Sequence, residues 1–275
     1  MTGARTTTAA GKTRFDDIYD EDDPRAYFRT LAPLRYEIPQ QARDVFRRTL
    51  AQRSAVRGTR LPVTVLDVCC SYGINAALLN HDLTLADLYA RYTSAETAAL
   101  TRGELIESDK KFYASRRLAD AVPVIGLDTA GNAVRYALEV GLLDEAYAEN
   151  LERHPPSDAL RHAVGRVGLI TVTGGIGYIT HHTFDALLDA TRIPVWVSAF
   201  VLRTVPYTEI LAVLDAHGLA TDTDPERTYP QRLFSDPAEQ ASAVELVLEA
   251  GDDPTGLEAD GRYYTRLHQS RPRPA

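Results

Sequence analysis

The chain has 275 residues, of which 44% are hydrophobic and 25% are charged, and these values are typical of a globular protein. No apolar run is long enough to span a membrane, so the sequence predicts a protein without a membrane partner. The formal net charge of −8 argues against nucleic acid as the main partner, because binding to phosphates depends on clustered Lys and Arg.

The first 60 residues precede the first predicted strand. Residues 1–13 are small and polar, which predicts a disordered tail. Residues 14–60 interleave aromatic side chains with acids and arginines and are expected to be helical. One interpretation is a lid that closes over the site and keeps water out. The alternative is a helix packed outside the sheet, with its aromatic residues as ordinary core.

Residues 63–80, VTVLDVCCSYGINAALLN, predict a strand, a turn and a helix. The apolar strand ends in Asp67, and the turn of small residues is centred on Gly73. Doubly wound α/β folds hold nucleotide-like ligands at this place, the carboxyl end of the first strand. Since the turn lacks the three glycines of a dinucleotide site, a ligand without a pyrophosphate fits better.

This segment resembles motif I of class I S-adenosylmethionine (SAM)-dependent methyltransferases, in which the turn wraps the methionine and ribose part of SAM. The resemblance implies a Rossmann-like α/β fold, with a mostly parallel sheet and an antiparallel C-terminal edge. It also implies SAM as the cofactor and a small molecule as the second substrate. The SAM-binding residues that it implies in this segment are Asp67, Cys69, Ser71, Gly73 and Asn75.

The second strand of this type runs from Pro123 to Leu127 and ends at Asp128, directly before a predicted helix. Its carboxylate can accept hydrogen bonds from both hydroxyls of a ribose, although Asp also commonly caps helices. Because 61 residues separate Asp67 from Asp128, against about 20 in the dinucleotide fingerprint, we expect residues 81–120 to be a helical insertion. The insertion either shapes a substrate pocket or serves as scaffold. The whole of 61–270 is then one SAM-binding domain.

A third strand, residues 167–174, occupies the place of methyltransferase motif IV and adds Thr173 and Gly174 to the expected SAM site. The Asn-Pro-Pro-Tyr signature of some amine methyltransferases is absent from it. Tyr178 follows, and its ring either faces a cation or packs at the entry to the next helix.

The rest of the chain continues the α/β pattern. A nearly continuous apolar strand from Ile193 to Leu202 is followed by predicted helices at 206–217 and 237–250. Segments 227–234 and 262–268 are expected to form the antiparallel strand pair that completes the sheet. The only cysteines, Cys69 and Cys70, are adjacent and no signal-peptide core is evident, so a reducing cytoplasm is the expected location.

Several chemistries remain open. Methyl transfer depends mainly on proximity, orientation and exclusion of water, and His181 or His182 could take a proton if the acceptor must lose one. The alternative places both histidines as polar residues in a helical turn. A second reaction is cyclisation of SAM itself, loosely similar to azetidine-2-carboxylate synthases, for which Asn132, Tyr178 and Ser198 lie near strand ends. A third possibility is non-catalytic SAM binding. Cys70 as a nucleophile stands against Cys70 as a small turn residue, and no metal-binding spacing stands out.

Overall fold

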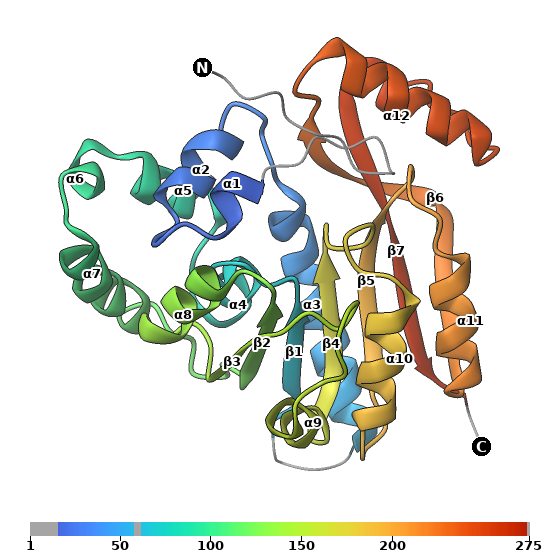
Figure 1. Cartoon of the computed structure of the whole chain (residues 1–275), viewed down its shortest axis with the longest axis horizontal. Coiled ribbons are helices and arrows are strands. Elements are labelled where there is room, and N and C mark those ends of the chain that lie inside the picture. Colours follow the sequence, from blue (N-terminus) through green and yellow to red (C-terminus); the bar gives the residue numbers. More distant parts are fainter. Residues whose placement is uncertain (1–15, 58–61, 274–275) are drawn as a thin grey trace.

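The computed structural model describes residues 16–57 and 62–273. Its fold is built on one seven-stranded sheet (Figure 1). The strand order is β3-β2-β1-β4-β5-β7-β6. The strands are β1 (Thr64–Val68), β2 (Val124–Asp128), β3 (Glu145–Ala148), β4 (Val167–Thr173), β5 (Trp196–Leu202), β6 (Leu219–Leu233) and β7 (Arg262–Pro272).

Strands β1 to β5 are mutually parallel, while β7 runs antiparallel to both β5 and β6. This arrangement confirms the fold class expected from the sequence, including the antiparallel edge. The apolar run of β4 explains its place, because every residue of β4 is buried and only a central strand is covered on both faces.

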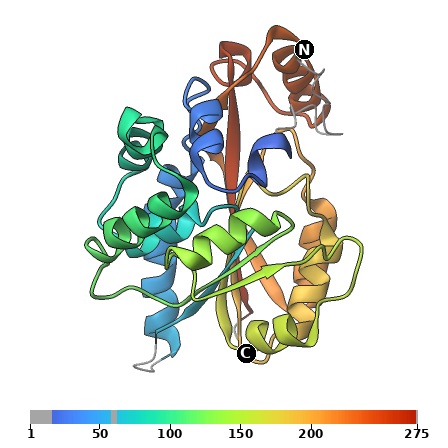
Figure 2. The same cartoon turned by 60° about the vertical axis from the view of Figure 1, so that its left-hand side comes forward.

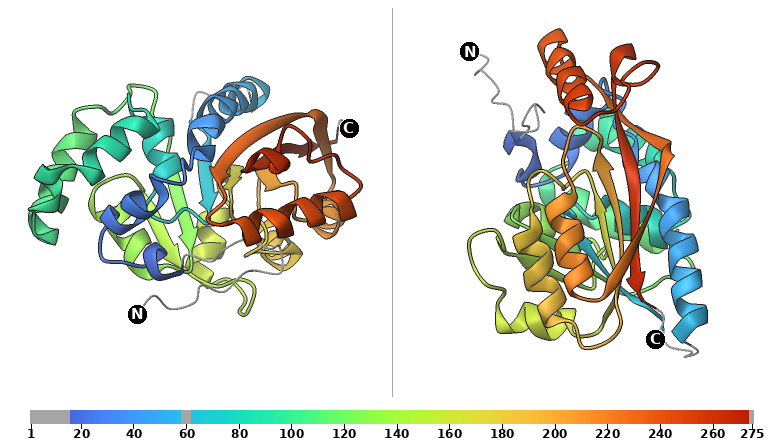
Figure 3. Two further views of the ribbon diagram at one scale, coloured as in Figure 1. Left: turned by 90° about the horizontal axis from the view of Figure 1, so that it is seen from above. Right: turned by 90° about the vertical axis from the view of Figure 1, so that its right-hand side faces the viewer.

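Helices cover both faces of the sheet, as the side view in Figure 3 shows. One face carries the larger hydrophobic core, and the other face carries a second core. The helices on the first face are α3 (Ile38–Arg57), α4 (Ile74–Asn80) and α8 (Gly131–Glu139). Those on the second face are α9 (Asp158–Val164), α10 (His181–Ala190) and α11 (Thr208–Ala216).

The expected insertion is helical. It lies between α4 and β2 and forms an arm beside the sheet (Figure 1). Its helices are α5 (Leu85–Thr93), α6 (Ala95–Ala98) and α7 (Arg102–Ala114). Two of them begin with reciprocal capping boxes, Thr84 with Asp87 and Thr101 with Glu104. These caps satisfy backbone N–H groups that a helix start otherwise leaves unpaired.

Residues 16–37, here called the N-terminal roof, lie over the carboxyl ends of the parallel strands (Figure 2). The roof contains α1 (Asp16–Tyr19) and α2 (Arg25–Leu31). It is joined to the far edge of the sheet, because Glu37 N donates to Gln231 O at 2.7 Å and Leu233 N donates to Leu34 O at 2.7 Å. Helix α12 (Pro237–Glu249) and a short 3-10 helix, η1 (Glu258–Asp260), lie between β6 and β7 in the chain.

The sequence analysis missed β3, α9 and the short η1. It also gave β6 and β7 shorter bounds than the structure does. Residues 1–15, which include the predicted disordered tail, lie outside the described part of the chain. Among the described residues, no helix combines the length and apolar composition needed to cross a membrane.

Candidate active site

A cavity of about 580 Å³ lies at the carboxyl ends of β1, β2 and β4, under the N-terminal roof. This is the edge where open α/β sheets bind their ligands. From the sheet it is lined by the turn after β1, the residue that ends β2, and the residues that follow β4. From above it is lined by roof residues, and on one side by the loop after β3. The lining residues used below are Tyr19, Asp20, Tyr27, Tyr36, Cys69, Ser71, Asn75, Asp128, Glu152, Thr173, Gly174 and Tyr178.

The turn after β1 has an unusual backbone. Cys69, Ser71 and Gly73 have φ angles of 58°, 48° and 75°, so all three lie in the left-handed region. Only glycine adopts this region without a steric penalty. The backbone of the turn therefore has dihedral angles typical of glycine, although two of its three left-handed positions carry side chains. Both of those side chains line the cavity.

Asp128 joins this turn to the end of β2. Its Oδ2 accepts a hydrogen bond from Ser71 N at 2.8 Å, and its Oδ1 accepts one from Ala130 N at 3.0 Å. Burial raises the pKa of Asp128, while the backbone donors partly offset that effect. The carboxylate thus fixes the turn and also faces the cavity.

Asp67 lies at the end of β1, 1% exposed, beneath the cavity floor. Its Oδ1 accepts from Asn75 Nδ2 and Thr171 Oγ1, both at 2.9 Å, and Asn75 Nδ2 also donates to Thr173 Oγ1 at 2.9 Å. Burial raises the pKa of Asp67 to about 7. Among the residues that the structure describes, no group bonds to its Oδ2. Asp67, expected to bind SAM, does not itself line the cavity, but from behind the cavity wall it holds Asn75 and Thr171 in place.

Tyrosines form the upper wall. Tyr19 and Tyr27 meet edge to face at 5.7 Å between ring centroids, and Tyr27 meets Tyr36 at 6.4 Å. Tyr178 lines the same cavity from the β4 side. Burial raises the pKa of Tyr19, Tyr27 and Tyr36, so their hydroxyls stay protonated at neutral pH. The wall therefore presents neutral aromatic rings and hydroxyl groups.

The roof is tied down next to Asp128. Asn132 N and Nδ2 donate to Asp20 Oδ1 and Asp20 O at 2.6 and 2.9 Å, and Tyr72 Oη donates to Glu21 O at 2.9 Å. Asn132 was expected near the reacting centre. It does not line the cavity, because its amide holds the roof over the start of α8.

The insertion holds the roof from the other side. Arg25 Nη1 donates to Thr97 O and Leu100 O at 3.1 and 2.8 Å. Phe28 of α2 stacks on Tyr92 of α5 at 4.8 Å. Behind Tyr92 lies a buried polar group, the insertion cluster, which consists of Asp109, Arg91, Tyr92, Tyr113 and Tyr136.

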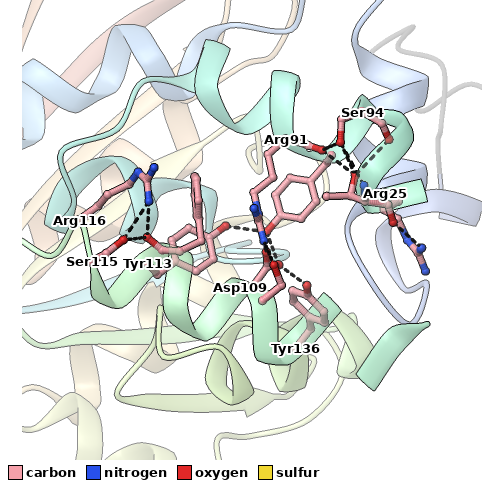
Figure 4. Close-up of polar contacts among 12 residues, drawn as sticks. Arg25, Arg91, Ser94, Asp109, Tyr113, Ser115, Arg116 and Tyr136 are labelled. Carbon is pink, nitrogen blue, oxygen red and sulfur yellow. Dashed lines mark hydrogen bonds and ion pairs between the residues drawn. The ribbon is translucent and has the colours of Figure 1, made fainter. Parts of the chain in front are cut away.

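Figure 4 shows the insertion cluster centred on Asp109. Arg91 Nε donates to Asp109 Oδ1 at 2.5 Å, and Tyr92 Oη donates to Oδ2 at 2.6 Å. Tyr136, from α8, also donates to Oδ2, and Tyr92 and Tyr113 share a hydrogen bond of 2.7 Å between their hydroxyls. The cluster joins α5, α7 and α8, so the insertion acts here as scaffold.

Three further residues expected at the site do not line the cavity. Gly73 packs instead against α8, where a Cβ would lie 3.1 Å from Ala137 Cβ. Ser198 lies in the middle of β5, fully buried, because strand alternation places it on the face covered by α3. His182 lines a shallow groove on the other side of the loop after β3, and His181 contacts Glu209.

Two structural features in or next to the cavity wall escaped the sequence analysis. Glu152, in the loop after β3, accepts hydrogen bonds from the backbone N and Oγ1 of both Thr180 and Thr183. It thereby closes the wall between β3 and α10. Gln231, on β6, lies next to Gly174. Neither residue stands in a recognisable motif, and β3 itself was not predicted.

Comparison with known proteins finds no matching family model and no curated protein with significant similarity. Magnesium protoporphyrin IX methyltransferase from Synechocystis PCC 6803 with bound SAM is similar at 13% identity over 85% of this chain and 79% of that one, with a TM-score of 0.41. The [4+2]-cyclase SpnF is similar at 12% identity over 85% and 82%, with a TM-score of 0.41. The plantazolicin methyltransferase BpumL with SAH is similar at 11% identity over 86% of each chain, with a TM-score of 0.41. By its own strand order and its antiparallel β7, the chain has the Rossmann-like fold of class I SAM-dependent methyltransferases.

Proposed function

We propose that this protein is a SAM-dependent enzyme that transfers the methyl group of SAM to a small-molecule acceptor. The observation that carries the proposal is the position of Asp128. It faces the cavity from the end of β2 and is held against the turn after β1, which is where a nucleoside is bound in this architecture.

The ribose end of the proposed site uses Asp128. A carboxylate has about four lone-pair positions, and the bonds from Ser71 N and Ala130 N use two of them. The remaining positions can accept both ribose hydroxyls. The raised pKa of Asp128, caused by burial, falls back when such donors bind the charged form.

The sulfonium end uses the tyrosine wall. A cation over an aromatic face gains about 0.5–2 kcal/mol, depending on how far it is desolvated. The charged residues among the described lining are Asp20, Asp128, Glu149, Glu152 and Arg153, so carboxylates prevail. An acid-rich lining with neutral rings favours a cationic ligand such as a sulfonium. When bound, SAM supplies the electrophilic methyl group, and the roof keeps water from it.

Cyclisation of SAM is a second candidate, because one cavity of about 580 Å³ lies within the size range of sites for a single small ligand. In that reaction the α-amine forms a bond to Cγ, and the bond between Cγ and sulfur breaks with its electron pair going to sulfur. The products are azetidine-2-carboxylate, neutral methylthioadenosine and one proton. No further reactant is required.

Product analysis separates these functions. Calorimetry first establishes whether the protein binds SAM. The protein is then incubated with SAM alone and with SAM plus a small-molecule extract, and the products are identified by mass spectrometry. S-adenosylhomocysteine that appears only with extract indicates methyl transfer, methylthioadenosine formed from SAM alone indicates cyclisation, and binding without either product indicates a non-catalytic role. Absence of SAM binding contradicts the proposal.

A further inference from the structure

Gln231 has a buried side chain whose amide makes no hydrogen bond to the described residues. It is 0% exposed, and both Oε1 and Nε2 lack a hydrogen-bond partner among the described residues. Its backbone oxygen, in contrast, accepts a hydrogen bond from Glu37 N. Since a buried, unpaired amide costs free energy, a residue such as Met or Leu would serve packing better.

Other glutamines in the chain show what a structural role looks like. Gln240 Nε2 donates to Glu258 O and Ala259 O at 3.2 and 2.8 Å. Gln269 Nε2 donates to Thr49 Oγ1 at 2.8 Å. Each of these amides has a protein partner, whereas that of Gln231 has none in the described part of the chain.

The amide of Gln231 lies directly behind Gly174, a residue of the cavity wall. A Cβ at position 174 would sit 3.2 Å from Gln231 Nε2 and 3.2 Å from Tyr36 Oη, so both polar groups face the same small space beside Gly174. Gly174 and Tyr36 both line the cavity. Because Gly174 has no side chain, the Gln231 amide and the Tyr36 hydroxyl can approach the backbone of the cavity wall closely.

A second buried polar group without a hydrogen-bond partner among the described residues, the Asp67 carboxyl group, lies behind the cavity wall near Thr173. Asp67 Oδ2 is buried without a partner among the described residues, and Asp67 is joined through Asn75 to Thr173, the neighbour of Gly174. Asp67 is also near enough to Tyr36 to contribute to its electrostatic environment. Behind this part of the cavity wall the chain thus holds an amide and a carboxyl oxygen that have no partner among the described residues.

We propose that Gln231 binds the α-amino-carboxylate end of SAM, with its amide donating to the carboxylate and accepting from the amine. The inference rests on the proposed SAM-dependent function and extends it to a residue on the far edge strand. An amide and an α-amino-carboxylate match because each presents donors and acceptors side by side.

The test measures ligand affinity and stability in parallel. Gln231→Met keeps the length of the side chain and removes the amide. Calorimetry is done with SAM, S-adenosylhomocysteine and methylthioadenosine, which lacks the amino-acid end. We expect affinity for the first two to fall about 10- to 150-fold, the range of one hydrogen bond to a charged group, and affinity for methylthioadenosine to be unchanged. The thermal midpoint without ligand should be equal to that of wild type or higher.

The controls keep the outcomes distinct. Gln240→Met changes a residue that does not line the cavity and should leave all three affinities unchanged. If Gln231→Met does not fold, Gln231→Leu is measured in the same way. Unchanged SAM affinity in the folded variant overturns the proposal, and so does an equal loss for all three ligands, which would indicate distortion of the cavity. If wild-type protein binds none of the three, the proposed function itself fails.

Discussion

Two buried polar clusters in this protein differ in how their hydrogen-bonding groups are used. In the insertion cluster, both oxygens of Asp109 accept bonds from neighbouring side chains. In a second group, Ser71 in the cavity wall and Asp67 and Gln231 behind that wall, several side-chain atoms have no partner among the described residues. Both clusters are buried, so burial of polar groups alone does not identify a binding site.

The two clusters differ both in whether their hydrogen-bonding groups are paired and in where they lie relative to the cavity. A complete network stabilises one packing arrangement, whereas unpaired groups at a cavity can be completed by a ligand. Ser198 Oγ is also unpaired, but it lies within β5 and away from the cavity. An unpaired polar atom therefore points to a ligand only where it borders a space that the ligand can enter.

The largest expected effect breaks the insertion cluster. Asp109→Asn removes the partner of Arg91 and places an N–H₂ group against the donors Tyr92 and Tyr136. Loss of one member of a buried ion pair typically costs about 3–5 kcal/mol. We expect a fall of this size in the free energy of unfolding, measured by urea denaturation.

The matched control for Asp109→Asn is Glu107→Gln on the same helix, where an exposed carboxylate contacts Lys110 at 2.7 Å. It should leave the free energy of unfolding nearly unchanged, because solvent screens an exposed ion pair. A small effect of Asp109→Asn would contradict the structural role of the cluster.

The next effect concerns Asp128. Asp128→Asn replaces charge-assisted hydrogen bonds to ribose, each worth about 1.5–3 kcal/mol, so SAM affinity should fall about 10- to 150-fold in calorimetry. Asp144→Asn is the control, because Asp144 Oδ2 accepts from Val124 N at the opposite end of β2. Equal SAM affinity in folded Asp128→Asn and wild-type protein would remove Asp128 from the ligand site.

The pH dependence of stability tests Asp67. Its pKa in the folded protein is raised by burial to about 7 from an ordinary value of 3.8, so the native state holds a proton that the unfolded state loses. Its contribution to stability is therefore present at low pH and is lost as pH rises from about 4 to about 7. Asp67→Asn should gain stability relative to wild type by more than about 1.4 kcal/mol between pH 4.5 and 7.5, the value of one pKa unit.

The control for Asp67 is Asp120→Asn, which changes an exposed residue and should follow the wild-type pH profile. Parallel profiles for Asp67→Asn and wild type would show that the carboxyl group of Asp67 titrates normally.

The smallest effect concerns the strained turn. Ser71→Gly removes a side chain from a φ of 48° and an Oγ that has no partner among the described residues. Relief of strain, about 1–2 kcal/mol, exceeds the entropic cost of glycine, about 0.5–1 kcal/mol. Thermal denaturation should show a gain of up to about 1 kcal/mol. Ser115→Gly, at a φ of −70°, is the control and should lose stability.

The sequence predicted the parts of the fold that repeat a local pattern. The apolar runs ending in Asp67 and Asp128 became β1 and β2, and the spacing between them predicted the helical insertion. Strand β3 was missed because its four residues are half-buried or exposed and contain no apolar run. A short edge strand of this kind leaves little periodic signal.

The candidate site was predictable only where it follows a strand end. Cys69, Ser71, Asn75, Asp128, Thr173, Gly174 and Tyr178 all line the cavity. Asn132 and Ser198 were expected at the site because they lie near strand ends or within a strand. In the structure Asn132 binds Asp20 from the start of α8, and strand alternation buries Ser198 within β5. Gln231 had no local signal, because it meets Gly174 only through the pairing of β6 and β7 at the far side of the sheet.

The two backbone bonds between the roof and β6 also set the order in which the protein can be assembled. They join residues roughly 200 positions apart, Leu34 with Leu233 and Glu37 with Gln231. On the ribosome, residues 34 and 37 emerge early, but their partners follow only when most of the chain has been made. We expect the roof to reach its final position only after β6 has been made, so that the ligand cavity is among the last parts of the nascent protein to form.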